Sequence, residues 1–224
     1  NRLDRIDELL EQHVKDQRIP GAVALIVRNG KIVYYKAFGY SDVERRSSLK
    51  KDDIFRIASQ SKAITSLAVM MLWEEGKFLL DDPVSKYIPE FKNPKVLKTF
   101  DKNDTTFTAE PAQRELTIRH LLAHSSGIDY AVIGSSEFKA IYAKAGVPSG
   151  IGNDREVLAD KMKLLATMPL KHEPRERFTY GLNTDMLGYL VEIWSGLSFD
   201  EFLKTRIFDP LGMTDTYFYL PKNK

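Results

Sequence analysis

The 224-residue sequence contains no cysteine. Disulfide bonds, a catalytic thiolate and cysteine-ligated metal sites are therefore excluded, and the redox compartment cannot be inferred. A surplus of one charge is also missing, because 33 Lys and Arg residues balance 31 Asp and Glu residues to a formal net charge of +2. This balance gives no reason to expect nucleic acid or an anionic membrane as a partner. No apolar run approaches the roughly 18 residues of a membrane span.

What is present is an ordinary globular composition, with 43% hydrophobic and 29% charged residues. A chain of this length can bury a substantial core. Apolar residues recur at helical spacing over 3–14, and two β-prone runs, 22–27 and 32–35, flank the pair Asn29-Gly30. An Asn-Gly pair between two such runs predicts a tight hairpin.

The remainder of the sequence has mainly helical periodicity. Helices are predicted over 59–75, over 118–124 after a Thr117 cap, over 155–167, over 184–195, and from Ser198, which has Glu201 at capping-box spacing. The polar segment 92–115 is predicted to be a long surface loop, and 130–153 shows no clear period. Two strands alone form a marginal sheet, so we expect the hairpin to need further strands or a helix.

Four Ser-x-x-Lys patterns occur, so the pattern alone identifies no nucleophile: Ser47/Lys50, Ser48/Lys51, Ser59/Lys62 and Ser136/Lys139. Only Ser59 stands at the N-terminal end of a long apolar helix. Residues three apart share one face of a helix, which lets Lys62 reach toward the Ser59 hydroxyl. The helix start also offers free backbone N–H groups and a positive dipole end, which suit a developing oxyanion.

Ser59 needs a neighbouring base, because a serine hydroxyl is a poor nucleophile until its proton is removed. Lys62 can be that base only if burial or nearby positive charge lowers its pKa. The alternative is that Ser59 merely caps the helix and that Lys62 is a solvated surface charge. Spacing and position leave both interpretations open.

Five segments, in order over nearly the whole chain, carry a family resemblance: Ile19-Pro20-Gly21, Phe55-Arg56-Ile57-Ala58-Ser59-Gln60-Ser61-Lys62, Leu80-Asp81-Asp82-Pro83-Val84, Leu116 to Gly127, and Phe208-Asp209-Pro210-Leu211-Gly212-Met213. They resemble the penicillin-binding-protein and serine β-lactamase superfamily, in particular class C β-lactamases and related esterases and D-Ala-D-Ala peptidases. The resemblance implies an α/β (α+β) fold, with an antiparallel sheet flanked by helices and a helical subdomain. It also implies acyl transfer through a covalent intermediate on Ser59, substrate contacts from Gln60, and no cofactor.

In that superfamily a tyrosine at the edge of the site accepts and returns a proton, commonly within a Tyr-x-Asn motif. The resemblance places Tyr180 in this role, although ordinary packing is the alternative. A phenol can act as a base only if nearby positive charge stabilises its phenolate. The position two after Tyr180 is Leu182, and Asn183 comes one residue later, which is closer to the esterase-like members. Asn183 either binds substrate or caps the following helix.

The third motif of the superfamily, a Lys-Thr-Gly or a variant on a later strand, has no counterpart here. From the resemblance we expect 1–224 to be the N-terminal and helical part of one catalytic domain. The remaining strands would be absent or supplied by a separate chain, which leaves the sheet and the oxyanion hole incomplete. The resemblance favours a periplasmic or secreted location.

Other patterns carry less weight. His120 and His124 are four apart, as in zinc proteases, but Leu121 stands where a catalytic glutamate would follow and no third ligand is suggested. We therefore expect no metal site, and expect both histidines to pack or to cap a turn. No Gly-x-Ser-x-Gly elbow or phosphate loop occurs. Several aromatic residues either line an acyl pocket or pack in the core: Tyr130, Phe138, Tyr142, Phe218 and Tyr219.

These patterns together predict a serine hydrolase whose substrate is a small-molecule or peptide ester, amide or β-lactam. An esterase or D-amino-acid peptidase is favoured over a dedicated β-lactamase, because of Leu182 and the long segments 92–115 and 130–153. The alternative is a non-catalytic module that captures an acyl ligand without turnover. Rapid ester turnover that is lost in Ser59→Ala would separate the two.

Overall fold

The computed structural model describes residues 2–149, 157–222 and 224. The chain divides into two compact units, 1–57 and 58–224. That both units belong to one catalytic domain stays a prediction. Within the described ranges, no helix is long and apolar enough to cross a membrane.

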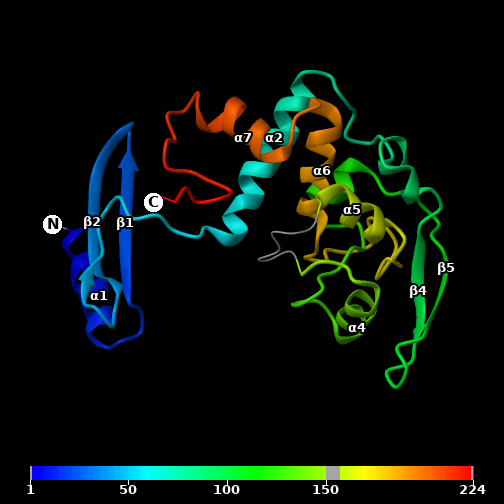
Figure 1. Cartoon of the computed structure of the whole chain (residues 1–224), viewed down its shortest axis with the longest axis horizontal. Coiled ribbons are helices and arrows are strands. Elements are labelled where there is room, and N and C mark those ends of the chain that lie inside the picture. The colour runs from blue at the N-terminus through cyan, green and yellow to red at the C-terminus, as the bar shows by residue number, and fades with distance from the viewer. Residues whose placement is uncertain (1, 150–156, 223) are drawn as a thin grey trace. The chain divides into compact units, whose positions relative to one another are not determined.

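The first unit is a three-stranded antiparallel sheet with one helix, α1 (Asp4–Lys15). Its strands are β1 (Gly21–Arg28), β2 (Lys31–Asp42) and β3 (Ser47–Ser48), in the order β1-β2-β3 (Figure 1). Asn29 and Gly30 join β1 to β2 with φ values of 50° and 71°. Positive φ at both central residues is what a two-residue hairpin turn requires, so the predicted Asn-Gly hairpin is confirmed.

A polar contact fastens α1 to the sheet. Asp7 on α1 accepts hydrogen bonds from the Tyr34 hydroxyl and from Lys36 Nζ, both on β2. The Tyr34 side chain is buried beneath the helix. The hairpin therefore gains the helical support that a two-stranded ribbon needs.

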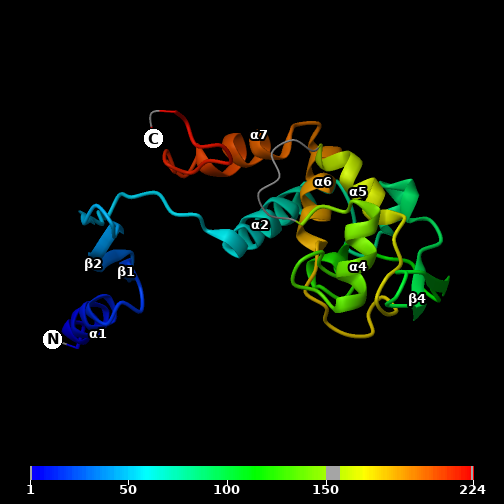
Figure 2. The ribbon, with the colours of Figure 1, turned by 60° about the horizontal axis from the view of Figure 1, so that its bottom comes forward.

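The second unit is mainly helical, with the short hairpin β4–β5 at its side. Figures 1 and 2 show α5 and α6 side by side, and α6 also packs on α2, α3 and α7. The elements are η1 (Ala58–Gln60), α2 (Ser61–Glu74), η2 (Val84–Lys86), η3 (Pro89–Phe91), β4 (Lys95–Phe100), β5 (Phe107–Pro111), α3 (Ile118–Leu122), α4 (Ser136–Ala145), α5 (Leu158–Ala166), α6 (Asn183–Ser195), α7 (Phe199–Leu203) and η4 (Lys204–Phe208).

Helix α6 is the centre of this unit because apolar residues cover most of its circumference. A helix that is hydrophobic on nearly all sides belongs inside a core. Its buried apolar residues face those of α2 and neighbouring elements: Met186, Leu187, Leu190, Val191 and Trp194 on α6, and Ala68, Val69 and Leu72 on α2. The two helices that follow Ser59 and Tyr180 in the chain are thus fixed against each other.

One sequence prediction for this unit is wrong, and one helix was not predicted. Segment 92–115 is not a loop, since it contains the antiparallel hairpin β4–β5, and Val96 on β4 pairs with Leu170 in a parallel bridge. Segment 130–153 contains α4, which buries Phe138, Ile141 and Tyr142 at helical spacing and ends at Gly146 with φ 75°. In both segments, polar residues next to the apolar ones obscured the periodic pattern. Residues 150–153 and the predicted helix start at 155–156 lie outside the described residues.

The two predicted helix caps have opposite outcomes. Thr117 and His120 form a complete capping box on α3, which confirms the Thr117 cap. The Ser198 side chain makes no capping hydrogen bond on α7, so that capping box is wrong. Instead the Phe199 N–H donates to the Glu192 carboxylate at 2.9 Å. A carboxylate from the preceding helix thus satisfies the N–H of the first residue of α7.

Removing the Thr117 cap should destabilise the protein by about 1 kcal/mol, the usual effect of an N-cap threonine. In Thr117→Ala the His120 N–H loses its side-chain acceptor at the start of α3. Denaturant unfolding of the two proteins measures the difference. Thr117→Ser, which keeps the hydroxyl, should lie close to wild type, and equal losses in both variants would contradict the capping role.

Candidate active site

Ser59 lies in the short helical turn η1, directly before α2, and its side chain is exposed. Ala58, the residue before it, has φ 43°, in the left-handed region that L-residues with a side chain avoid. The buried face of α2 holds the start of this helix in place. Gln60, the other predicted contact residue here, is exposed beside Ser59.

The structure brings Ser59 and Tyr180 together across 121 positions of sequence. The Ser59 Oγ and the Tyr180 hydroxyl are 2.7 Å apart. Lys62 Nζ lies 4.9 Å from the centre of the Tyr180 ring and donates a hydrogen bond to the Tyr130 hydroxyl at 3.1 Å. Among the described residues no hydrogen bond joins Lys62 to Ser59, so the serine meets its candidate proton acceptor at Tyr180.

The pKa values of Lys62 and Tyr180, the two candidate bases, are shifted in opposite directions. Burial acts to lower the pKa of Lys62, but its interactions with the oxygens of Tyr130 and Tyr180 outweigh burial and raise that pKa above its ordinary value. The hydrogen bond with Ser59 and the positive charge of Lys62 lower the pKa of Tyr180 despite partial burial. Lys62 is therefore an ammonium at neutral pH and does not meet the condition set for a lysine base. Tyr180 is the group that is eased toward ionisation.

Tyr130 is the second tyrosine at this lysine, and its pKa moves the other way. Burial raises the pKa of Tyr130, opposed by its hydrogen bond with Lys62 and assisted by the charge of Asp185. Its ring centre lies 5.4 Å from that of Tyr180. The surroundings thus shift the pKa values of the two tyrosines in opposite directions, and Tyr180 is the one that ionises more readily.

Asn183 is fully buried. Its carbonyl oxygen accepts a hydrogen bond from the Ser126 hydroxyl. Its amide nitrogen donates to His124 Nδ1 at 3.1 Å and to the Thr179 carbonyl at 3.5 Å. In this structure the Asn183 side chain is hydrogen-bonded within the protein at the start of α6, and its contact with substrate stays a prediction.

His124 connects this buried amide to the site. Its ring stacks on Tyr180 with centres 5.1 Å apart. Burial and the positive charge of Lys62 lower the pKa of His124, which keeps its ring neutral. That state agrees with Nδ1 accepting from Asn183. His120 instead accepts the Thr117 N–H in the capping box, so both histidines pack or cap, as predicted.

The other sequence candidates lie elsewhere. Ser136 and Lys139 are exposed on α4, and Ser47 and Ser48 are exposed on the edge strand β3. Phe138 and Tyr142 are buried in the core. Within the described residues no group of three or more His, Asp or Glu side chains could hold a metal ion. Sequence reasoning gave Tyr130 no role at Lys62, because no spacing rule connects a loop tyrosine to a lysine 68 positions earlier.

Comparison with known proteins bears directly on this arrangement. A family model described as Beta-lactamase matches residues 6–224. The chain belongs to the beta-lactamase family. The antiparallel sheets and helices agree with the predicted beta-lactamase and transpeptidase-like fold, which is thereby confirmed.

Within this family the chain is 33% identical to esterase EstB of Burkholderia gladioli, over 96% of this chain and 51% of EstB. Among solved structures it is similar to EstCE1, a hydrolase with promiscuous acyltransferase activity, with 31% identity and a TM-score of 0.79 over 93% of this chain and 51% of EstCE1. It is also similar to the octameric penicillin-binding protein homologue from Pyrococcus abyssi, with 30% identity and a TM-score of 0.70 over 97% of this chain and 44% of that protein. The chain thus spans about half the length of these beta-lactamase family members.

Proposed function

We propose that the protein carrying this chain is a serine hydrolase that works through a covalent acyl-enzyme on Ser59. The observation that carries the proposal is the 2.7 Å contact between Ser59 Oγ and the Tyr180 hydroxyl, with the Lys62 ammonium above the Tyr180 ring. A nucleophile within hydrogen-bond reach of a base, itself held by a third group, is the arrangement that nucleophilic catalysis needs.

In the proposed reaction the Tyr180 phenolate takes the Ser59 proton while Oγ attacks the acyl carbon. The carbonyl electron pair moves onto oxygen, where the Ser59 backbone N–H donates to the oxyanion. Tyr180 then returns the proton to the departing alcohol or amine as its bond to the acyl carbon breaks. Water repeats the sequence with Tyr180 as base, which releases the acid and restores Ser59.

Lys62 has an electrostatic role in this scheme. Its ammonium stabilises the Tyr180 phenolate and keeps its place through the hydrogen bond to Tyr130. An ion in a partly buried site acts with less screening than at the surface. Because Lys62 keeps its proton throughout, the scheme needs no lysine of lowered pKa.

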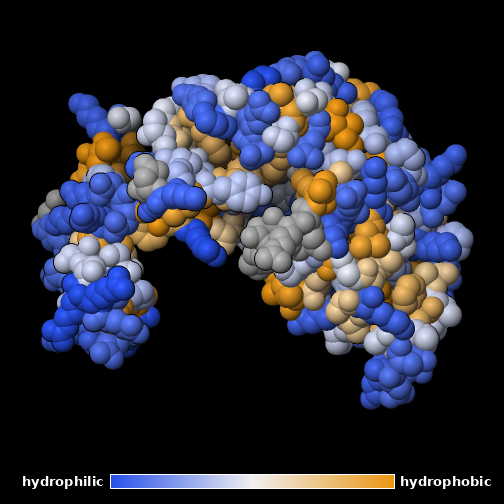
Figure 3. Space-filling view, in the orientation of Figure 1, coloured by the Kyte–Doolittle hydropathy of each residue, from blue (hydrophilic) through white to orange (hydrophobic). Residues whose placement is uncertain are grey.

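For substrate class we propose an ester or a D-amino-acid peptide, so that the protein is an esterase or a peptidase rather than a dedicated β-lactamase. The similarity to EstB, which is named an esterase, supports esters. The similarity to EstCE1, a hydrolase with promiscuous acyltransferase activity, supports acyl transfer. Exposed apolar side chains adjoin both tyrosines in sequence, namely Val132, Ile133 and Phe178. Hydrophobic patches also interrupt the hydrophilic surface in Figure 3. The three exposed apolar side chains near the tyrosines favour an acyl group with an apolar chain.

The proposal is tested by intact mass spectrometry of the whole protein after exposure to a serine-reactive fluorophosphonate. We expect one adduct, which disappears in Ser59→Ala and persists in Ser136→Ala. The second variant is a matched control because Ser136 also begins a helix and precedes a lysine by three positions. An adduct that survives Ser59→Ala would overturn the proposal. Turnover of a simple ester supports the hydrolase, whereas a stable acyl adduct without turnover favours the capture module.

A further inference from the structure

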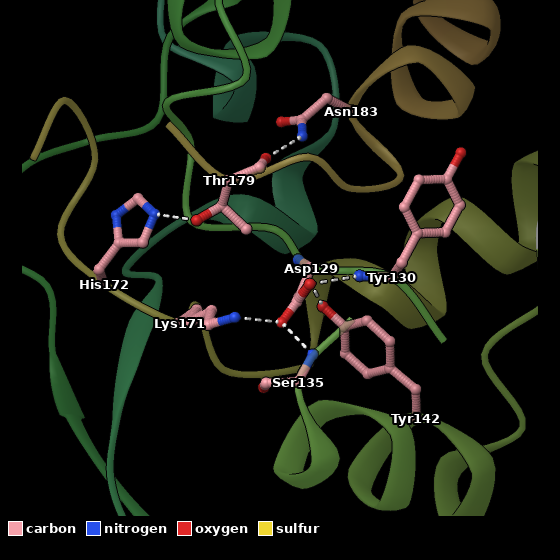
Figure 4. Close-up of polar contacts among 8 residues, drawn as sticks. All are labelled: Asp129, Tyr130, Ser135, Tyr142, Lys171, His172, Thr179 and Asn183. Carbon is pink, nitrogen blue, oxygen red and sulfur yellow. Dashed lines mark hydrogen bonds and ion pairs between the residues drawn. The ribbon is translucent and has the colours of Figure 1, made fainter. Parts of the chain in front are cut away.

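Asp129 is a buried carboxylate outside the Ser59–Tyr180 contact, with a side chain only 2% exposed. Three hydrogen-bond donors converge on it. Oδ1 accepts the Tyr130 N–H at 2.9 Å, while Oδ2 accepts the Ser135 N–H at 3.1 Å and Lys171 Nζ at 2.8 Å. Figure 4 shows the carboxylate between these groups, with the Tyr142 hydroxyl next to the Asp129 backbone.

Only a side chain that accepts hydrogen bonds on both of its terminal atoms can satisfy these three donors. An ionised carboxylate has acceptor sites on both oxygens, whereas an amide has one acceptor oxygen and presents two donors on its nitrogen. The interactions with Lys171 and with the two backbone N–H groups lower the pKa of Asp129 despite its burial. The hydrogen bonds from the loop therefore stabilise the ionised form of the Asp129 carboxylate.

The loop from Asp129 to Ser135 closes tightly over this carboxylate. A Cβ on Gly134 would lie 2.3 Å from the Tyr130 carbonyl oxygen and 2.5 Å from Asp129 Oδ1. Such distances leave no room for any side chain at position 134. The loop conformation is thus defined by contacts to Asp129 at both of its ends.

The same residue borders both tyrosines of the site. Its own side chain binds the backbone N–H of Tyr130, whose hydroxyl meets Lys62. Its carbonyl oxygen accepts the Leu182 N–H at 3.3 Å, two residues beyond Tyr180. Asp129 therefore connects the loop that carries Tyr130 to the segment that carries Tyr180.

We propose that Asp129, neutralised by Lys171, is a positioning residue that holds the Tyr130 hydroxyl on the Lys62 ammonium. The inference rests on the proposed function, because Lys62 matters only if Tyr180 acts as the base. A buried ion pair contributes little net stability once desolvation of both charges is counted. Its effect here is geometric, since it fixes where Tyr130 can direct its hydroxyl.

The test compares Asp129→Asn with wild type in the whole protein, by kcat and KM for a p-nitrophenyl ester and by the rate of fluorophosphonate labelling. Asn keeps the size of the side chain but cannot accept from all three donors. We expect kcat and the labelling rate to fall by about tenfold to a hundredfold, as for a displacement on the order of 1 Å at a reacting group, with little change in KM. Measurements are made below the unfolding midpoint of each variant.

Asp82→Asn is the matched control for lost stability. Asp82 also accepts from a backbone N–H, that of Leu79, and from a lysine, Lys86, each at 2.9 Å. It receives the Tyr87 hydroxyl as well and makes no hydrogen bond to the Tyr130 loop. We expect Asp82→Asn to lower the unfolding midpoint while leaving kcat near the wild-type value.

A double-mutant cycle with Tyr130→Phe separates positioning from general loosening of the fold. If Asp129 acts through the Tyr130 hydroxyl, Asp129→Asn has little further effect once that hydroxyl is gone. A kcat that falls equally in both backgrounds, or that does not fall in Asp129→Asn, would overturn the inference. Absence of Ser59 labelling in wild type would instead overturn the proposed function, so the two failures are distinguishable.

Discussion

Tyr180→Phe should lower kcat for ester hydrolysis by about a thousandfold, within the range that general acid–base groups contribute. The substitution removes the oxygen that lies 2.7 Å from Ser59 Oγ and leaves the ring in place. Lys62 cannot substitute, because its raised pKa keeps it protonated and it has no hydrogen bond to Ser59 among the described residues. Steady-state kinetics on the whole protein measure the loss.

The pH dependence of kcat/KM gives the same residue a second signature. The pKa of Tyr180 is lowered from its ordinary 10.0, mainly by the hydrogen bond to Ser59. Activity should therefore rise with pH as the phenol ionises, with the midpoint of the rise below pH 10. The pKa of Lys62 is raised above 10.5, so its charge is lost only at higher pH. Tyr180→Phe should abolish the rising limb.

Tyr87→Phe serves as the control, since it removes a hydroxyl that donates a 2.6 Å hydrogen bond to Asp82 and does not contact Ser59. Its kcat should remain near wild type. A Tyr180→Phe protein that retains a substantial part of wild-type kcat would rule out Tyr180 as the base.

Gly181→Ala should destabilise the protein by at least about 3 kcal/mol, at the upper end of what overpacking does. A Cβ at this position would lie 2.0 Å from the Ile128 carbonyl oxygen and 3.0 Å from the Asp129 carbonyl carbon. Both atoms belong to the backbone and cannot rotate aside. The clash must separate the Tyr180 segment from the Tyr130 loop, so we expect activity to fall with stability.

Gly188→Ala on α6 provides the comparison. There the added Cβ would lie 3.3 Å from the Phe199 ring, and alanine is favoured over glycine in a helix by about 1 kcal/mol. The two effects oppose each other, so denaturant unfolding should show a small change of either sign. If Gly181→Ala is as mild as Gly188→Ala, the close approach of the two backbones does not matter for stability.

The sequence was informative where a local rule decides the structure. The Asn29-Gly30 turn and the Thr117 cap depend on a few neighbouring residues, and both could be predicted. The β4–β5 hairpin and α4 could not, because their polar exposed faces masked the apolar spacing. The pairing of Val96 with Leu170, 74 positions apart, has no local signal.

The candidate site divides in the same way. Helix spacing makes Ser59 and Lys62 candidates, and the family resemblance points to the roles of Ser59 and Tyr180. Tyr130 comes to Lys62 only through the folded loop that Asp129 holds. The direction of the Lys62 pKa shift could not be predicted from the sequence either, because it depends on two tyrosine oxygens that oppose the effect of burial.

The backbone at Ala58 limits which residues evolution can place before the serine. With φ 43°, this position requires a left-handed conformation that costs an alanine on the order of 1–2 kcal/mol. Glycine adopts it freely and asparagine tolerates it, whereas valine, isoleucine and threonine are poorly suited because branching at Cβ adds to the clash. Natural variation at this position should therefore be limited by the shape of the side chain and not by its polarity. Substitution by residues branched at Cβ should be rare even where the neighbouring residues vary.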